Sequence, residues 1–341
     1  MSVSVAIVST VRTTRSTLRM FAHYYLNTGV DRMFLFFDDP RDEALADVQG
    51  DSRITAIRCD DAHWAAANLS SRAPIEVRQC HNANIALQLA KAEGITWLIH
   101  VDSDELIVMP QSHIGSYLKE KADYDAVRFA ALEAVPKARY VWHPFQEIHW
   151  FKSEKPYFRG AGTIAQALGC RKLFELGYIK GHSFGKMAAR LSSSIVEMNT
   201  HGPIRRKGSP FHVAEAADAF TLHFDCCTFE EWKVKWGRRL DGTATAKDMR
   251  KERRQQFAEF ERVFQSGLEL ALRSTYRRRY GISGIQLALL AALGFVRRVH
   301  LHDGCFIASS YVTPASVSSV DASPGAHQSK IAPRPERAPA A

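Results

Sequence analysis

The sequence predicts an α/β fold in which a mostly parallel sheet is flanked by helices and followed by a helical C-terminal extension. Short apolar, β-branched segments alternate with segments of helical period through residues 3–101. Glycines stand where two of the helical segments end, and acidic residues follow directly after two of the strands. A strand-helix-strand order of this kind is typical of parallel sheets that carry helices on both faces.

The first strand and the first helix are predicted from residues 3–28. Residues 3–10 are apolar and β-branched, which favours a buried strand. Leu18, Phe21 and Tyr25 then recur at helical spacing, and Gly29 follows as a stop signal. The same patterns continue along the chain and predict strands over 33–37, 53–58 and 96–101 and a helix over 75–93.

The pattern is less regular after Asp125 and predicts strands over 126–131 and 220–224, a long basic helix over about 246–273, and a short apolar segment over 285–296. The last residues are rich in Pro, Ala and Ser and cannot bury enough apolar surface to become ordered. We therefore expect an α/β domain over 1–242, a basic helical region over 243–308 and a disordered tail over 309–341.

Composition limits the class of protein. The 341 residues are 46% hydrophobic, which suffices for one large domain with an appendage. The six cysteines form no CxxC pair, so neither a disulfide framework nor a structural zinc site is indicated. No export signal is predicted, and the apolar run over 285–296 is shorter than the roughly 20 residues of a spanning helix. These features predict a cytoplasmic protein.

Acidic pairs follow two of the predicted strands: Asp38 and Asp39 after the second, and Asp102 and Asp104 after the strand over 96–101. Open α/β sheets bind ligands at the carboxyl ends of their strands. Residues two apart in an extended segment point to the same face, so the second pair of carboxylates converges on one point. Mg²⁺ and Mn²⁺ are typically held by one or two carboxylates together with substrate phosphates.

A solvated turn is the simpler interpretation of Asp102 and Asp104 taken alone, because short motifs match by chance. An EF-hand is excluded, since Leu106 and Ile107 occupy positions that need an oxygen ligand and a glycine. The context favours the metal site. An apolar strand precedes the pair, and Glu105 with a further apolar run follows it, an arrangement that resembles the metal-binding motif of glycosyltransferases with the GT-A fold, in particular the bacterial family-2-like group.

Three other stretches are similar to that family in consistent order through residue 242. The opening strand and helix with Phe34 to Asp39 resemble its nucleotide-binding half, and Lys186 and His201, in Gly-Lys-Met and Thr-His-Gly-Pro, resemble its donor-site segment. Leu-His-Phe around His223, followed by Phe-Glu-Glu-Trp and Lys-Trp, resembles its closing element. One departure stands after the first strand, where the family commonly has Lys-Asn-Glu and this chain has Val-Arg-Thr-Thr over 11–14.

The resemblance implies roles for particular residues. Asp104, His223 and Asp102 would hold Mn²⁺ or Mg²⁺, with Asp102 also near the ribose. Asp38 and Asp39 would face the nucleoside, and Lys186 and His201 the phosphates. His223 has a separate argument, because the alternation in FTLHFD places it on the polar side of its strand. These residues also have plainer interpretations: His223 as a structural histidine, Lys186 as a surface lysine, and His201 as a residue that fixes a turn.

An inverting transferase needs a carboxylate base that deprotonates the acceptor hydroxyl. Glu133, just past the strand over 126–131, is the first candidate. Glu147 and Glu154 are close rivals that spacing does not separate, and a surface ion pair is an alternative role for each of the three. If the reaction retained the anomeric configuration instead, the assignment of this base would not apply.

The charge of +9 is concentrated in residues 228–300, where 16 Lys and Arg face 8 Asp and Glu, a local charge of 16 − 8 = +8. Cations around the short apolar segment over 285–296 suit an anionic membrane surface, where lipid-linked acceptors are found. Core packing of the apolar segment is an equal alternative. The sequence contains no recognisable nucleic-acid-binding module.

The sequence therefore predicts transfer of a sugar from a nucleotide-diphosphate donor, UDP-linked by default, to a hydroxyl of a glycan or lipid-linked acceptor, in surface polysaccharide or glycolipid assembly. One alternative is a nucleotidyltransferase on a similar sheet, although the first strand lacks the Gly-rich triphosphate loop that such enzymes ordinarily carry. The other is a non-catalytic protein that binds nucleotide-sugars, which is consistent with the acid missing after the first strand.

Overall fold

The structure is a computed structural model that describes residues 3–111, 113–137, 141–152, 161–170, 184–192, 194–242 and 251–301. Glu154 and the tail predicted over 309–341 lie outside these residues, as do residues 243–250 of the predicted long helix.

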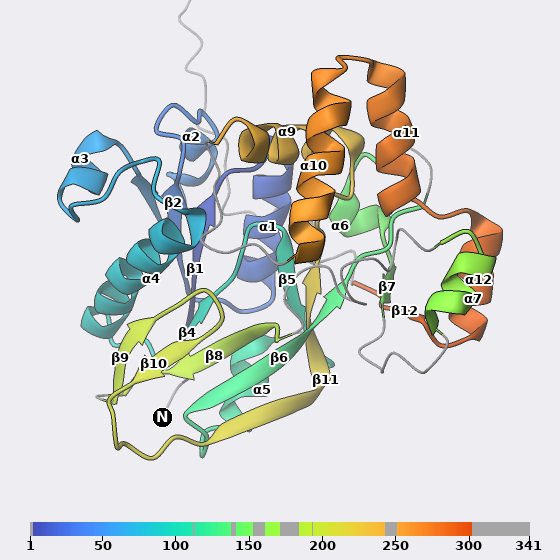
Figure 1. Cartoon of the computed structure of the whole chain (residues 1–341). Helices are drawn as coiled ribbons and strands as arrows, with labels where there is room; N and C mark the ends of the chain where they lie inside the picture. Colours follow the sequence, from blue (N-terminus) through green and yellow to red (C-terminus); the bar gives the residue numbers. More distant parts are fainter. Residues whose placement is uncertain are drawn as a thin grey trace, which may run out of the picture.

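The core of the molecule is an eight-stranded sheet of order β3-β2-β1-β4-β8-β6-β11-β5 (Figure 1). The adjacent strands β3, β2, β1 and β4 pair in parallel, as do β6 and β11. Strands β8 and β5 are antiparallel to the others. This α/β, Rossmann-like arrangement confirms the predicted fold class and is consistent with the GT-A class. In chain order the strands are β1 (Val5–Val11), β2 (Arg32–Phe37), β3 (Ile54–Arg58), β4 (Trp97–His100), β5 (Glu105–Val108), β6 (Ala126–Glu133), β8 (Lys186–Arg190) and β11 (Val213–His223).

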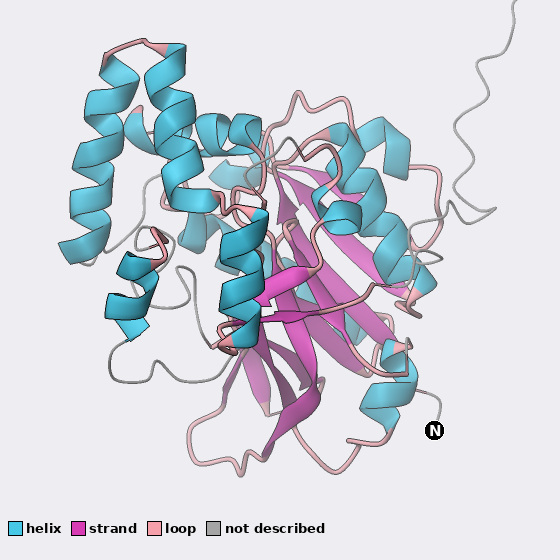
Figure 2. Ribbon diagram, turned by 90° about the vertical axis from the view of Figure 1, so that its right-hand side faces the viewer, coloured by secondary structure: helices cyan, strands magenta, loops and turns pink. Residues whose placement is uncertain are grey.

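Helices cover both faces of the sheet because the strands are apolar on both sides (Figure 2). Along β1, Val5, Ile7 and Val11 pack with α1, while Ala6 and Val8 pack with α4. Five helices belong to these two layers: α1 (Arg15–Asn27), α2 (Leu45–Val48), α3 (Asp61–Ala65), α4 (Ile75–Ala92) and α5 (Ile114–Lys119). Thr14 caps α1, since its hydroxyl accepts a hydrogen bond from the backbone of Thr17.

The C-terminal region is helical, as predicted, but the prediction of one long helix over about 246–273 is wrong. The structure has α10 (Lys251–Gln265) and α11 (Glu269–Tyr280), which stand side by side in Figure 1. Gly267 separates them with a φ of +63°, a backbone conformation that glycine adopts without steric cost. Both helices share an aromatic core with α9 (Phe229–Leu240), built around Trp232 and Trp236.

The apolar segment over 285–296 forms α12 (Gly284–Ala292) and reaches β12 (Val296–Arg298), which pairs with β7 (Trp150–Lys152). Leu287 and Leu290 are buried, whereas Ile285 and Leu289 are exposed. Each helix within the described residues is too short or too polar to cross a membrane. The remaining elements are α6 (Pro144–Glu147), α7 (Ala161–Ala167) and a two-stranded sheet of β9 (Ile195–Met198) and β10 (Pro203–Arg205).

The sequence pattern located the central strands to within a few residues but missed β5, β7, β8, β9, β10 and β12. The predicted strand over 220–224 is the end of the much longer β11. The five cysteines within the described part of the chain are free thiols.

Candidate metal centre

The connection from β4 to β5 carries Asp102 and Asp104, the pair that resembles a metal-binding motif. It carries the chain from the middle of the sheet to its edge, where β5 pairs with β11. The backbone N–H of Asp102 donates to the Glu105 carboxylate at 2.8 Å, and the N–H of Phe224 donates to the carbonyl of Asp104 at 2.8 Å. These bonds fix the turn and hold it against the end of β11.

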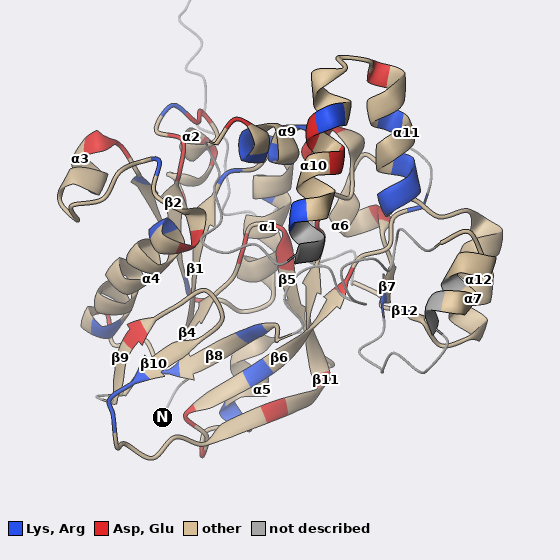
Figure 3. Ribbon diagram, in the orientation of Figure 1, with Lys and Arg blue, Asp and Glu red and all other residues tan. Residues whose placement is uncertain are grey.

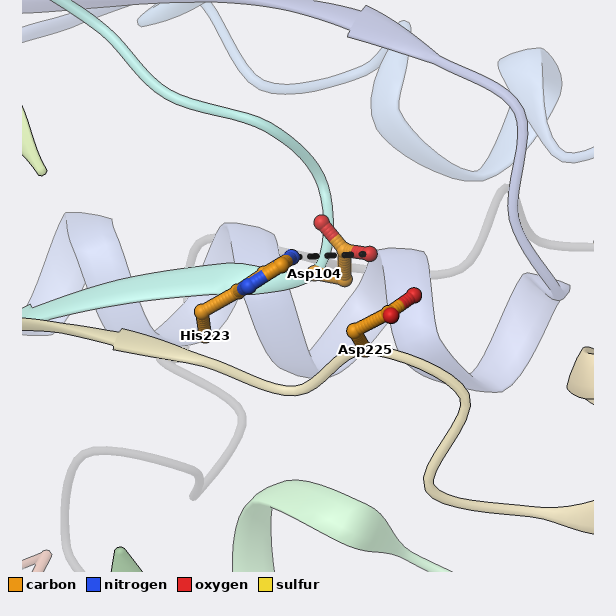
Figure 4. Close-up of side chains that lie close together, drawn as sticks. All are labelled: Asp104, His223 and Asp225. Carbon is orange, nitrogen blue, oxygen red and sulfur yellow. Dashed lines mark ion pairs between the residues drawn. The ribbon is translucent and has the colours of Figure 1, made fainter. Parts of the chain in front are cut away.

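Asp104 meets His223 and Asp225 at this point. One ligand atom from each of the three residues lies within 4.8 Å of the others. His223 ends β11, and its Nε2 is 3.8 Å from Oδ2 of Asp104. Figure 4 shows the imidazole directed at the Asp104 carboxylate, with Asp225 beside it on the segment that follows β11. Two segments distant in sequence thus supply the cluster.

The donor set suits a hard or borderline divalent cation. Carboxylate oxygens are preferred by Mg²⁺ and Mn²⁺, and a neutral imidazole is a common ligand of first-row metals. Burial disfavours a charged His223, but the carboxylates of Asp104 and Asp225 outweigh it and raise the pKa of the imidazole. A metal binds the neutral imidazole and therefore competes with its proton, so metal binding at His223 is expected to weaken at low pH.

A lysine already lies against the same carboxylates. The ammonium of Lys235 on α9 is 2.6 Å from Oδ1 of Asp225 and 3.2 Å from Oδ2 of Asp104. The helix is fixed at its start by a capping box between Thr228 and Glu231. Burial opposes the charge on Lys235, but the two aspartates outweigh it and raise the pKa of the ammonium well above its ordinary value.

The other aspartate of the motif, Asp102, belongs to a neighbouring, more deeply buried cluster. Its Oδ1 accepts a hydrogen bond from Gln79 at 2.7 Å, and its Oδ2 faces the Lys186 ammonium at 3.0 Å. Lys186 is also 3.1 Å from Glu105 and donates to the carbonyl of Thr200 at 2.9 Å. Burial raises the pKa of Asp102, and the nearby Lys186 charge more than reverses this, so that the carboxylate stays ionised.

The resemblance predicts a contact between Lys186 and the phosphates of the donor. The structure places it at the start of β8, 1% exposed, with its three donors directed at Asp102, Glu105 and Thr200. In this arrangement it orients Asp102 and compensates two buried carboxylates. The phosphate contact stays a prediction.

Replacing Lys186 by methionine is expected to lower the free energy of unfolding by about 3–5 kcal/mol, because it leaves buried carboxylates without their counter-charge. Chemical denaturation at pH 7 measures the loss. Lys207→Met, at an exposed position, is the control. A loss no larger than that of the control would show that the Lys186 cluster contributes little to stability.

His100, at the end of β4, interacts electrostatically with Lys186 and Asp102 of this cluster and is 1% exposed. Its Nδ1–H donates to the carbonyl of Asn199 at 3.0 Å. Burial, aided by the charge of Lys186, lowers the pKa of His100 to about 4. The imidazole is therefore neutral in the folded protein at physiological pH.

The lowered pKa of His100 predicts that the stability of the fold depends on pH. An unfolded histidine titrates near pH ~6.5, so between about pH 4 and 6.5 the unfolded chain binds more protons at this position. Stability is thus complete above that window and falls as the pH drops through it. We expect His100→Gln to flatten the curve of unfolding free energy against pH by up to about 1.4 kcal/mol per unit. Parallel curves for wild type, His100→Gln and the exposed control His212→Gln would contradict this.

The predicted nucleoside contacts lie at the end of β2, on the same edge of the parallel sheet as the end of β4. Asp38 is buried and pairs with Arg78 and, at 3.2 Å, with Arg12. Asp39 is half-buried, and its Oδ1 accepts a hydrogen bond from the backbone of Arg41 at 3.0 Å. Arg12, in the segment after the first strand where the resembled family commonly has Lys-Asn-Glu, therefore faces the Asp38 carboxylate.

His201 is predicted to lie near the phosphates. Its ring Nδ1 is 3.2 Å from the carbonyl oxygen of Gly185, and its backbone N–H donates to Asn199 at 2.9 Å. Gly185 has a φ of +77°, and a Cβ there would overlap the carbonyl of Phe129. The histidine thus steadies the turn that leads into Lys186, and its contact with phosphate stays a prediction.

Glu133 lies next to the cluster in the sheet, because it is the register partner of His223 across β6 and β11. It is buried and pairs with the buried Lys152 at 2.7 Å. Its rival Glu147 accepts hydrogen bonds from the backbone of Trp142 and His143, both at 2.7 Å. Of the predicted bases that the structure describes, Glu133 alone is a register neighbour of His223.

Sequence reasoning assigned no role to Asp225, Lys235 or Glu105. The alternation in FTLHFD did carry a signal for Asp225, since it places that residue on the face of His223. No comparable signal exists for Lys235, whose contact with Asp104 joins residues 131 positions apart. Burial and its neighbour Asp102 raise the pKa of Glu105 to about 7, although Lys186 opposes this.

Comparison with known proteins finds similarity to proteins named glycosyltransferase-like. The chain is 28% identical over 165 residues to a glycosyltransferase-like protein of Arabidopsis thaliana, a match that covers 46% of this chain and 30% of the plant protein. A second glycosyltransferase-like protein of the same plant is 25% identical over 162 residues, covering 46% of this chain and 35% of its own length. The chain thus spans about a third of these curated relatives. No family model matches it.

Proposed function

We propose that this protein is a metal-dependent glycosyltransferase that moves a sugar from a nucleotide-diphosphate donor to an acceptor hydroxyl. The observation that carries the proposal is the meeting of Asp104, His223 and Asp225 at the carboxyl edge of a Rossmann-like sheet. Ligands bind at this edge in open α/β folds. The similarity to two proteins named glycosyltransferase-like supports the same reaction class.

Different residues at this edge would bind the metal ion and the nucleoside of the donor. Asp104, His223 and Asp225 would hold Mn²⁺ or Mg²⁺, with Asp102 next to them. A bound cation would supply charge neutralisation for the diphosphate as the glycosidic bond breaks. Asp39 would face the nucleoside, for which uridine is the default.

Positive charge gathers beside these carboxylates and suits an anionic donor. Burial and the neighbouring Arg12 lower the pKa of Arg78 to about 10, and the same two causes lower the pKa of Arg238 on α9 to about 10. Arg78 and Arg12 already share the Asp38 carboxylate, and a further anion near Arg12 and Arg238 would offset the remaining repulsion among these cations. A nucleoside diphosphate has that charge.

The acceptor hydroxyl needs a base, and Glu133 is the proposed one in an inverting reaction. It is held next to His223 by the sheet register, and it pairs with the buried Lys152 at 2.7 Å. The proposed role of Lys152 is to hold the carboxylate in place.

Product analysis tests the reaction class. The protein is incubated with UDP-, GDP- or CDP-linked sugars and Mn²⁺, with acceptor hydroxyls or water, and the products are separated. Release of the nucleoside diphosphate supports sugar transfer. Release of pyrophosphate from nucleoside triphosphates with a sugar phosphate would indicate a nucleotidyltransferase, and binding without turnover would indicate a non-catalytic protein.

We further propose that the acceptor is lipid-linked and that α12 contacts an anionic membrane at the cytoplasmic face. Ile285, Leu289 and Leu293 are exposed on or just after this helix, with Ile285 77% accessible. Arg277 and Arg278 precede it in the last turn of α11, one of the helices with blue, basic segments in Figure 3. An apolar face beside cations suits the surface of an anionic bilayer.

Vesicle co-sedimentation tests this contact. We expect binding to vesicles that contain phosphatidylserine, weaker binding to pure phosphatidylcholine, and at least a tenfold loss for Ile285→Glu with Leu289→Glu. Ile204→Glu, which changes an exposed apolar residue on β10, is the control. Equal sedimentation of all variants, or none with anionic vesicles, would contradict the membrane proposal.

A further inference from the structure

The candidate metal centre contains its own cation. The Lys235 ammonium lies 2.6 Å from Asp225 and 3.2 Å from Asp104, the two carboxylates that belong to the metal-ligand set. The side chain is 29% exposed. One face of the ammonium is thus bound to the carboxylates, while a four-carbon stem of rotatable bonds gives it a path towards solvent.

A divalent ion and this ammonium need the same oxygen atoms. Mg²⁺ lies about 2.0–2.1 Å from its carboxylate ligands, and such an ion would bring its charge directly against the ammonium at the distances found here. Like charges so close repel strongly in a partly buried site. Arg239 on the same helix adds a further positive charge near Lys235.

We propose that Lys235 is an internal counter-ion that occupies the cation position in the metal-free protein, and that the ammonium and a divalent metal exclude one another at Asp104 and Asp225. The inference rests on the metal site of the proposed function. It adds that the Lys235 charge compensates the two carboxylates when no metal is bound. Two consequences follow: Lys235 lowers metal affinity, and metal binding releases the Lys235 amine.

The first experiment measures Mn²⁺ affinity by calorimetry without nucleotide. Lys235→Met preserves the length and apolar stem of the side chain and removes the competing charge. We expect this variant to bind Mn²⁺ at least tenfold more tightly than wild type. Lys233→Met is the matched control, because Lys233 is on the same helix, is 42% exposed and pairs with Glu269 instead.

The second experiment uses the wild-type protein and so does not depend on the folding of a variant. Lysine amines are labelled with a limiting amount of acetic anhydride, with and without Mn²⁺, and the modified peptides are measured by mass spectrometry. We expect the labelling of Lys235 to rise several-fold with Mn²⁺ while that of Lys233 stays constant.

Equal Mn²⁺ affinity of wild type and Lys235→Met, with unchanged labelling, would overturn the inference but leave the metal site standing. Absence of Mn²⁺ binding in both proteins would overturn the inference together with metal dependence. Sugar transfer measured without metal would then decide separately whether the proposed reaction class survives.

Discussion

Replacing Asp104 by asparagine is expected to reduce sugar transfer at least a hundredfold. The substitution keeps the size of the side chain and removes the charge that Lys235 contacts and that a metal ion would contact. A metal supplies several kcal/mol of charge stabilisation in such reactions, and each ~1.4 kcal/mol changes the rate tenfold. Initial rates of nucleoside diphosphate release from the donor, at saturating Mn²⁺, measure the loss.

The control for Asp104→Asn is Asp123→Asn, at an exposed position in the turn before β6. Thermal denaturation of both variants shows whether the fold is retained. Transfer by a folded Asp104→Asn at a rate within tenfold of wild type would contradict the role given to this carboxylate.

Replacing Glu133 by glutamine is expected to lower the rate of transfer by roughly 10²–10⁴-fold, the usual contribution of a general base. Hydrolysis and transfer both need deprotonation of the attacking hydroxyl, so both should fall. The affinity for the nucleotide should change little, because Glu133 is assigned to the acceptor. Steady-state kinetics with a saturating donor separates these effects.

The ion pair of Glu133 with Lys152 complicates that variant, since the glutamine no longer balances a buried lysine. Glu133→Gln combined with Lys152→Met removes both charges and is expected to restore stability without restoring activity. Glu147→Gln is the control for the rival base and should retain activity. Recovery of transfer in the double variant would assign Glu133 a structural role only.

The central strands and the edge that carries the site were predictable because their signals are local. Runs such as TWLIHV are buried on both faces and need no partner to be recognised as strands. The position of Asp102 and Asp104 after such a strand then placed them at the carboxyl edge. The convergence of Asp104 with His223 followed from the resemblance rather than from spacing.

The arrangement around Lys186 could not be predicted, since it depends on pairing between distant strands. Lys186 reaches Asp102 across 84 positions of sequence, because β8 inserts antiparallel between β4 and β6. A Gly-Lys-Met segment in a region rich in glycine and histidine gives no sign of that strand. The break at Gly267 was missed for another reason, because a single glycine within a helical pattern is a weak local signal.

The most direct test of the central claim is the binding of UDP, GDP and CDP measured by calorimetry with and without Mn²⁺, for wild type and Asp104→Asn. We predict that one nucleotide, by default UDP, binds wild type in the presence of Mn²⁺ only, and that Asp104→Asn loses this binding. Failure of all three nucleotides to bind, or equal binding by the variant, would contradict a metal-dependent donor site at Asp104, His223 and Asp225.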